Sequence, residues 1–160
     1  MTTLATAPLP TVGAEAPGFV LDSTTGSKVS LAEFRGAKHV LLAFFPLAFT
    51  STCTAEMCAF SDDYSAFAAE DVVVIPISVD SVASLKEYKA KYNMAVELAS
   101  DFRRDVSRAY GVLNEDRFYA RRSYFLVDKA GILRWSFVEE HGGHRRENAE
   151  LLAEIAKLRA

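Results

Sequence analysis

The sequence predicts an α/β protein whose mixed central β-sheet is flanked by helices. Two observations carry this prediction: short apolar runs alternate with amphipathic stretches, and paired strand-like runs stand near both ends of the chain. The chain has 160 residues, and 50% of them are hydrophobic, which suffices for one sizeable core. We therefore expect residues 13–160 to form one domain behind a flexible tail, residues 1–12.

The first predicted elements are a hairpin, a buried strand and a helix. Residues 19–21 and 28–31 flank DSTTGS, whose glycine and small polar residues suit a turn. VLLAFF at 40–45 is apolar throughout and ends at Pro46, as expected for a strand covered on both faces. Residues 54–69 carry an apolar stripe at spacings of three and four, which predicts one amphipathic helix.

The second half of the chain continues the alternation. The predicted elements are a buried strand at 72–79, helices at 84–92 and 106–110, strands at 123–128 and 132–138, and a last helix at 146–158. The segment SVDS at 78–81 is interpreted as a turn at the end of a strand. This order of elements is compatible with a thioredoxin-like sandwich that carries an extra N-terminal β-hairpin.

Charge and hydropathy argue against several classes of partner. The formal net charge is −3 without a long single-sign run, so we expect no nucleic acid and no anionic membrane as partner. The longest apolar stretch, 39–49, is interrupted by Pro46 and is shorter than the ~20 residues that span a bilayer. The first residues lack the basic and apolar segments of a secretory signal, and we expect a cytoplasmic location.

Both cysteines of the chain stand in one short stretch, PLAFTSTCTAEMC at 46–58. Cys53 follows a buried strand, at the point where a loop gives way to a helix, and the free N–H groups and dipole of a helix start favour a thiolate. Thr50 can offer a hydroxyl toward the sulfur, and Pro46 orders the loop and shields the sulfur from water. The pattern indicates an activated nucleophile. The alternative is a buried cysteine that packs as a small apolar residue.

The motif Pro46-x-x-x-Thr50-x-x-Cys53 resembles the active-site signature of the peroxiredoxins, thiol peroxidases that use neither metal nor haem. LLAFFPLAFTSTC and YGVLNE are similar to the alkyl hydroperoxide reductase E branch of that family. CTAEMC is instead similar to the peroxiredoxin Q, or bacterioferritin comigratory protein, branch. The resemblance extends from about Gly13 onward and implies a thioredoxin-like fold, no cofactor, and a thiol-dependent peroxidase that acts on hydrogen peroxide and organic hydroperoxides.

This resemblance implies roles for further residues. Cys53 would attack the hydroperoxide as a thiolate and become a sulfenic acid. The family arginine beside the sulfur maps onto Arg122, and strand alternation sends its neighbour Arg121 to the opposite face. An always-charged guanidinium can stabilise the thiolate and the departing oxygen. Glu56 matches a recurrent family position and can orient the arginine, although a solvated charge in the first helical turn is the alternative.

Cys58 matches the family position of a resolving cysteine, which would capture the sulfenic acid as a disulfide. Five residues of helix rotate by about 500° and rise about 7.5 Å, whereas a disulfide needs α-carbons roughly 4.4 to 6.8 Å apart. The helix around residues 53–60 must therefore unwind in such a cycle. The resemblance implies recycling by thioredoxin or a similar dithiol. The alternative is a one-cysteine cycle in which Cys58 is an apolar filler and the resolving thiol is external.

Other interpretations stay open beside the peroxidase. A redox sensor would use Cys53 without turnover, whereas a disulfide reductase is disfavoured because the C-x-x-C spacing is absent. A zinc site built from the cysteines with His141 and His144 is disfavoured by their spacing, so we expect no metal. We expect a homodimer, with a monomer as the alternative. We also consider an apolar collar for the substrate, with core packing as the alternative role for its residues: Phe44, Phe45, Phe49 and Leu113.

Overall fold

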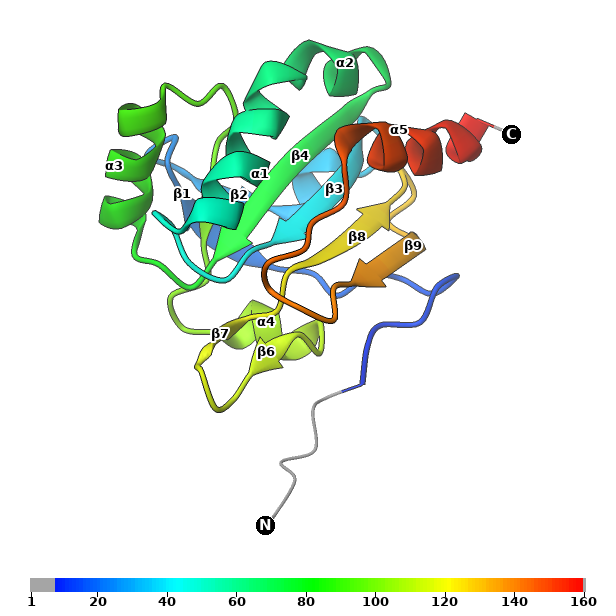
Figure 1. Cartoon of the computed structure of the whole chain (residues 1–160). Helices are drawn as coiled ribbons and strands as arrows, with labels where there is room; N and C mark the ends of the chain where they lie inside the picture. The colour runs from blue at the N-terminus through cyan, green and yellow to red at the C-terminus, as the bar shows by residue number, and fades with distance from the viewer. Residues whose placement is uncertain (1–7, 160) are drawn as a thin grey trace.

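The structure is a computed structural model that describes residues 8–159, so most of the tail predicted for residues 1–12 lies outside the described part. Its main sheet has the strand order β2-β1-β5-β4-β3-β8-β9 (Figure 1). β4 pairs in parallel with β3 and with β5, and the remaining pairs are antiparallel. The strands are β1 (Val20–Ser23), β2 (Lys28–Ser30), β3 (His39–Phe44), β4 (Val72–Ser78), β5 (Ala99–Ser100), β8 (Ser123–Val127) and β9 (Leu133–Val138). The prediction of a mixed sheet with an N-terminal hairpin is confirmed.

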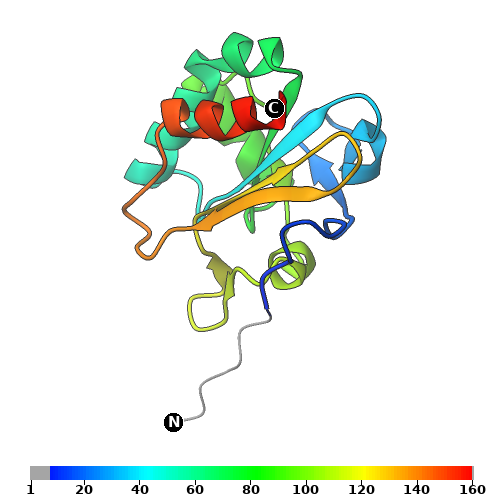
Figure 2. The same ribbon diagram turned by 90° about the vertical axis from the view of Figure 1, so that its right-hand side faces the viewer.

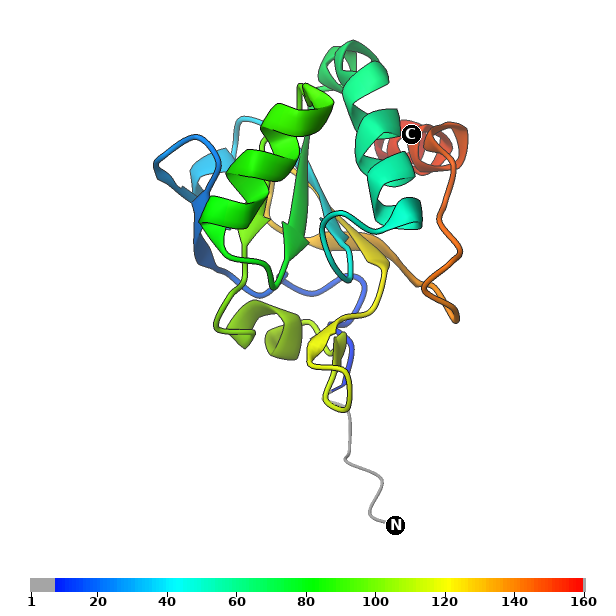
Figure 3. The same cartoon turned by 60° about the vertical axis from the view of Figure 1, so that its left-hand side comes forward.

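Helices lie on both faces of this sheet. The α-helices are α1 (Ser51–Asp62), α2 (Tyr64–Ala69), α3 (Val82–Tyr92), α4 (Asp105–Ala109) and α5 (Asn148–Ala156), with short 3-10 helices η1 (Leu31–Phe34) and η2 (Lys157–Arg159). α1, α3 and α5 pack together over one face (Figure 3). α4 lies on the other side of the β8–β9 pair from α5 (Figure 2). A separate two-stranded ribbon pairs β6 (Leu113–Asn114) with β7 (Tyr119–Ala120).

The sequence of the central strand β3 is apolar throughout because the strand is buried on both faces. Successive side chains of a strand point to opposite faces. Leu41 and Ala43 accordingly join the core cluster under α1, α3 and α5. Val40, Leu42 and Phe44 join the cluster that includes η1 and α4. Both faces of β3 are therefore buried, and its C-terminal end delivers the chain into the loop before α1.

The long helix predicted for residues 54–69 is two helices, α1 and α2, which is a correction. The chain bends at Asp63, where the side-chain amide of Asn148 donates to the Ala59 carbonyl at 2.8 Å and to the Asp63 carboxylate at 2.9 Å. Tyr64, counted in the apolar stripe, is 52% exposed after this bend. The last helix begins at Asn148 rather than at residue 146.

Candidate active site

The loop between β3 and α1 is held in place by contacts from α3 and from the segment between β4 and α3. The Ala48 N–H donates to the carboxylate of Asp80 at 2.9 Å, so the SVDS segment anchors this loop in addition to turning the chain. Phe49 adopts a left-handed backbone with φ of 67°, which is uncommon for a bulky residue. Its ring packs against Tyr88 of α3 with centroids 4.8 Å apart. Thr50 then serves as the N-cap position of α1.

Cys53 lies in the first turn of α1 and is only 1% exposed. The guanidinium of Arg122, directly before β8, donates from Nη2 to the Cys53 Sγ at 2.9 Å. Arg122 is itself 2% exposed, so the contact is shielded from water. A buried positive charge within hydrogen-bond distance stabilises the thiolate form of a sulfur. The structure thus places Arg122, rather than Arg121, against the candidate nucleophile.

Glu56 orients this arginine from the next turn of α1. Nη1 of Arg122 donates to Glu56 Oε1 at 2.9 Å, and both side chains are buried. The hydroxyl of Tyr124 donates to Glu56 Oε2 at 2.6 Å. The carbonyl of Gly142 accepts from Nε and Nη2 of Arg122 at 3.3 and 3.2 Å. The solvated position considered for Glu56 is therefore wrong, because its carboxylate is part of a buried network.

Burial and charge act in opposite directions on this network. Burial raises the pKa of the Glu56 carboxyl, although Arg122 and the Tyr124 hydroxyl oppose the rise by favouring the carboxylate. Burial alone lowers the pKa of the Arg122 guanidinium, but Glu56 and Cys53 attract its charge and the net shift is upward. Burial also raises the pKa of Tyr124, and the adjacent Glu56 raises it further. Tyr124 therefore stays a hydrogen-bond donor at neutral pH.

Pro46 and Thr50 both belong to the segment that leads from β3 into the helix of Cys53. Pro46 is half-buried and lines a cavity of about 160 Å³ together with Arg122, Tyr119 and Gly142. The Thr50 side chain is exposed, and its hydroxyl donates to the Leu47 carbonyl at 2.8 Å. The hydrogen bond from Thr50 to Leu47 therefore closes the loop. The Thr50 hydroxyl oxygen can still accept a hydrogen bond from another group.

Cys58 lies on the same uninterrupted helix as Cys53 and is half-buried. Both cysteines are free thiols. Because the two cysteines are five positions apart on one helix, a bond between their sulfurs requires local unwinding of α1. The Thr54 hydroxyl, between the two cysteines, bonds the Tyr88 hydroxyl at 3.0 Å and links this part of α1 to α3.

The proposed apolar collar is mostly core. Phe44 and Phe45 are fully buried and Leu113 is 2% exposed, whereas Phe49 is 49% exposed. Only Phe49 of the four is thus open to an approaching substrate. Within residues 8–159, no group of three or more His, Cys, Asp or Glu side chains could hold a metal ion. No helix in that same part of the chain is long and apolar enough to cross a membrane.

Three contributors to the site were missed by sequence reasoning: Tyr124, the Gly142 carbonyl and Asp80. Tyr124 stands two residues after Arg122, and strand alternation places positions two apart on one face, so it could have been found. Gly142 belongs to the loop EEHGGH, and it contributes a backbone carbonyl that accepts from Arg122. A pattern of side chains in the sequence cannot predict a contact made by the backbone. Asp80 reaches the site only because β3 and β4 are parallel neighbours.

A buried thiol at a helix start, paired with an arginine on a thioredoxin-like sheet, defines a thiol-based redox enzyme. Comparison with known proteins narrows this class, since residues 12–136 match the AhpC/TSA family. The chain is 40% identical over 133 residues to alkyl hydroperoxide reductase E of Mycobacterium tuberculosis, covering 82% of this chain and 87% of the relative. It is 38% identical over 128 residues to the bcp peroxiredoxin of Coxiella burnetii, covering 76% and 84% of the two chains.

A solved structure agrees with these sequence matches. The reduced 2-Cys peroxiredoxin of Plasmodium vivax superposes with a TM-score of 0.87 at 33% identity, covering 94% of this chain and 83% of the other. The chain belongs to the AhpC/TSA family and is a peroxiredoxin, a thiol peroxidase, with the resemblance to two branches that its motifs predict.

Proposed function

We propose that the protein reduces hydrogen peroxide and organic hydroperoxides with Cys53 as the peroxidatic thiol and Cys58 as the resolving thiol. The observation that carries this proposal is the 2.9 Å contact between Arg122 Nη2 and Cys53 Sγ inside a buried network. The name of the mycobacterial relative, alkyl hydroperoxide reductase E, supports organic hydroperoxides as substrates. The cavity beside Pro46 and Arg122 offers a route for a small hydroperoxide.

In the first step, the Cys53 thiolate attacks the terminal oxygen of the hydroperoxide. An S–O bond forms, the O–O bond breaks, and the leaving oxygen departs as an alkoxide or hydroxide that takes a proton from solvent to give alcohol or water. Arg122 serves this step twice, because its charge stabilises the thiolate and then the charge on the departing oxygen. Glu56 and Tyr124 keep the guanidinium in that position. The Thr50 hydroxyl closes the loop through its bond to the Leu47 carbonyl, and we expect its oxygen to accept from the bound hydroperoxide.

In the second step, the first turns of α1 unwind and the Cys58 thiolate attacks the sulfenic sulfur. The S–O bond breaks, water leaves after protonation, and a Cys53–Cys58 disulfide forms. Disulfide formation protects Cys53 from further oxidation to sulfinic acid. A dithiol such as thioredoxin then supplies two electrons and returns both thiols. We expect this reductant to be a protein, the enzyme to be a homodimer, and its location to be cytoplasmic.

Stopped-flow peroxide reduction by wild type, Cys53→Ser and Cys58→Ser tests both cysteine roles. We expect Cys53→Ser to lose the reaction and Cys58→Ser to keep the first step while accumulating sulfenic acid. Mass spectrometry of the wild type after one equivalent of peroxide should show a Cys53–Cys58 disulfide. A persistent Cys53 sulfenic acid beside a free Cys58 thiol would establish the one-cysteine cycle instead. A single stoichiometric oxidation without turnover in the presence of a dithiol would support the redox sensor.

A further inference from the structure

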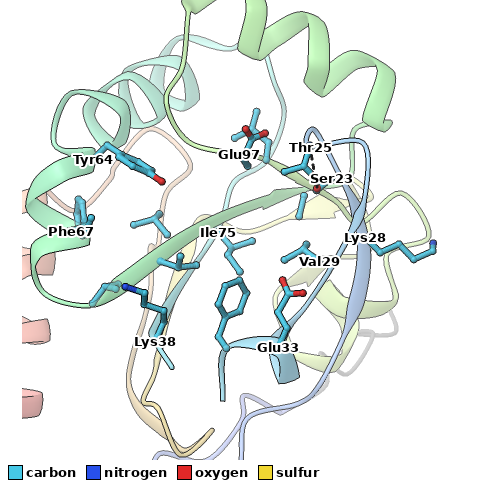
Figure 4. A pocket seen from close by; sticks show the side chains of 17 residues that line it. Ser23, Thr25, Lys28, Val29, Glu33, Lys38, Tyr64, Phe67, Ile75 and Glu97 are labelled. Atoms are coloured by element: carbon cyan, nitrogen blue, oxygen red, sulfur yellow. Dashed lines mark hydrogen bonds between the residues drawn. The ribbon is translucent and has the colours of Figure 1, made fainter. Parts of the chain in front are cut away.

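A second cavity, of about 320 Å³, lies at the end of the sheet away from Cys53. It is bounded by the first half of β4, the β1–β2 hairpin, η1 and α2 (Figure 4). β3 and β4 run in parallel, with His39 beside Val72 and Phe44 beside Ile77. The lining residues 72–75 therefore stand at the opposite end of these strands from the loop that carries Cys53. The peroxidase chemistry does not use this cavity.

The cavity exists because the sheet splits between β4 and β1. On its outer edge, β4 meets β5 only at Ile77 and Ser78. β5 has two residues, and it connects onward to β1. Among residues 8–159, no strand therefore pairs with this edge of β4 over residues 72–75. The gap between β4 and the hairpin is the space that a longer β5 would fill.

The free edge of β4 presents a paired donor and acceptor to this cavity. In an extended strand, the N–H and C=O of one residue point to the same edge, and those of the next residue to the other edge. The Ile77 carbonyl accepts from the Phe45 N–H, so the backbone N–H and C=O groups of Ile77 point toward β3. The backbone groups of Ile75 and Val73 point the same way, because they lie two and four positions earlier on the strand. Val74 consequently directs its N–H and C=O away from β3, into the cavity that it lines.

The walls and rim restrict what can occupy the space. The walls are apolar, formed by side chains on both sides of the gap: Val29, Phe34, Phe67, Val73, Ile75 and Leu98. At the rim, Lys28 pairs with Asp22 and Lys38 with Asp71.

Glu97 at the rim is also occupied, since it pairs with Lys89. Glu33 is different: within residues 8–159 it has neither an ion pair nor a hydrogen bond, and Figure 4 shows its carboxylate pointing toward Val29. The rim thus leaves one negative group available to a ligand.

We propose that this cavity binds a flat, mostly apolar small molecule whose edge carries an amide-type donor and acceptor for Val74. A basic or hydroxyl group on the same molecule would contact Glu33. The cavity volume falls in the range of small-molecule sites, and apolar walls with few convergent polar groups are their usual composition. The site adds a binding activity that is separate from hydroperoxide reduction.

Phenanthridinone is a suitable probe, because it has three flat rings and a lactam with adjacent N–H and C=O groups. We expect it to shift the Val74 amide resonance saturably in a ¹H–¹⁵N NMR titration of the whole protein. N-methylphenanthridinone lacks the donor and should bind about fivefold more weakly, since one hydrogen bond is worth on the order of 1 kcal/mol. Equal affinities for the two probes, or no saturable shift at Val74, would overturn the proposal.

A matched pair of variants locates the probe. Ala68→Trp adds a large side chain to the cavity wall and should reduce the affinity for phenanthridinone at least about tenfold. Ala69→Trp changes the next exposed residue of α2, which does not line the cavity, and should leave the affinity unchanged. Both variants should still reduce peroxide, and this activity serves as the control that they fold. Equal binding by wild type and Ala68→Trp would place the probe elsewhere and contradict the proposal.

Discussion

The two cysteines share one helix but have very different surroundings. Cys53 is 1% exposed and accepts from Arg122, which Glu56 and Tyr124 hold in place. Cys58, one and a half turns later, is half-buried and stands outside that network. Cys53 therefore has the surroundings of an activated thiol, whereas the resolving role proposed for Cys58 requires α1 to unwind first.

The largest effect should come from the arginine that distinguishes the two sulfurs. Arg122→Ala removes the charge that stabilises both the thiolate and the leaving oxygen, and we expect the rate constant for peroxide reduction to fall about 10²- to 10³-fold. The matched control is Arg121→Ala, which removes the neighbouring guanidinium and should change the rate less than about threefold. Stopped-flow kinetics measure both, and a similar loss in the two variants would refute the assignment.

Removing the carboxylate behind the arginine should lower stability strongly. Glu56→Ala leaves a buried guanidinium without its ion partner, and we expect the free energy of unfolding to fall by about 3–5 kcal/mol. Glu115→Ala breaks the exposed ion pair with Arg108, formed at 3.2 Å, and should cost less than about 1 kcal/mol. Urea unfolding measures both. Equal losses would show that the Glu56 network does not stabilise the fold.

A milder change tests the movement of Cys53 toward Cys58. Ala55→Gly lowers helix propensity at an exposed position between the cysteines, at a cost of about 1 kcal/mol. If unwinding limits the second step, disulfide formation should become up to about fivefold faster. Ala153→Gly makes the same change at an exposed position of α5 and should leave the rate unchanged. Unchanged rates in both variants would remove unwinding as the limiting event.

The remaining effect is confined to alkaline pH and concerns the tyrosine that links α1 to α3. Burial raises the pKa of Tyr88 from its ordinary value of 10.0 to about 12. Because the folded pKa exceeds the unfolded one, its contribution to stability is fully present below pH 10 and declines as the pH rises toward 12. Tyr88→Phe should therefore lose less stability than wild type between these pH values. Urea midpoints across this range check the prediction, and parallel declines would contradict it.

Much of the fold could be predicted from the sequence because its central elements are long and patterned. The apolar run of β3 and the N-terminal hairpin have clear signatures, whereas β5, β6 and β7 have two residues each, too few to show a period. The break at Asp63 is bound by Asn148, through a contact between distant parts of the chain. Local patterns do not contain such contacts.

The candidate site was likewise predictable where its residues lie in one local motif, and not where they meet through long-range contacts. Cys53, Thr50 and Pro46 lie in one motif, and Arg122 followed from the family resemblance together with strand alternation. The buried position of Glu56 and the contribution of the Gly142 carbonyl depend on how α1, β8 and the loop after β9 meet. These contacts are long-range, and only the three-dimensional structure brings them together.

Hydrogen–deuterium exchange of α1 tests the central claim most directly. In the reduced protein, the amides of residues 54–60 should exchange slowly, as expected for a packed helix. In protein oxidised by one equivalent of peroxide, the same amides should lose protection, while those of α3 and α5 keep theirs. A Cys53–Cys58 disulfide that forms while α1 retains full protection would contradict the account.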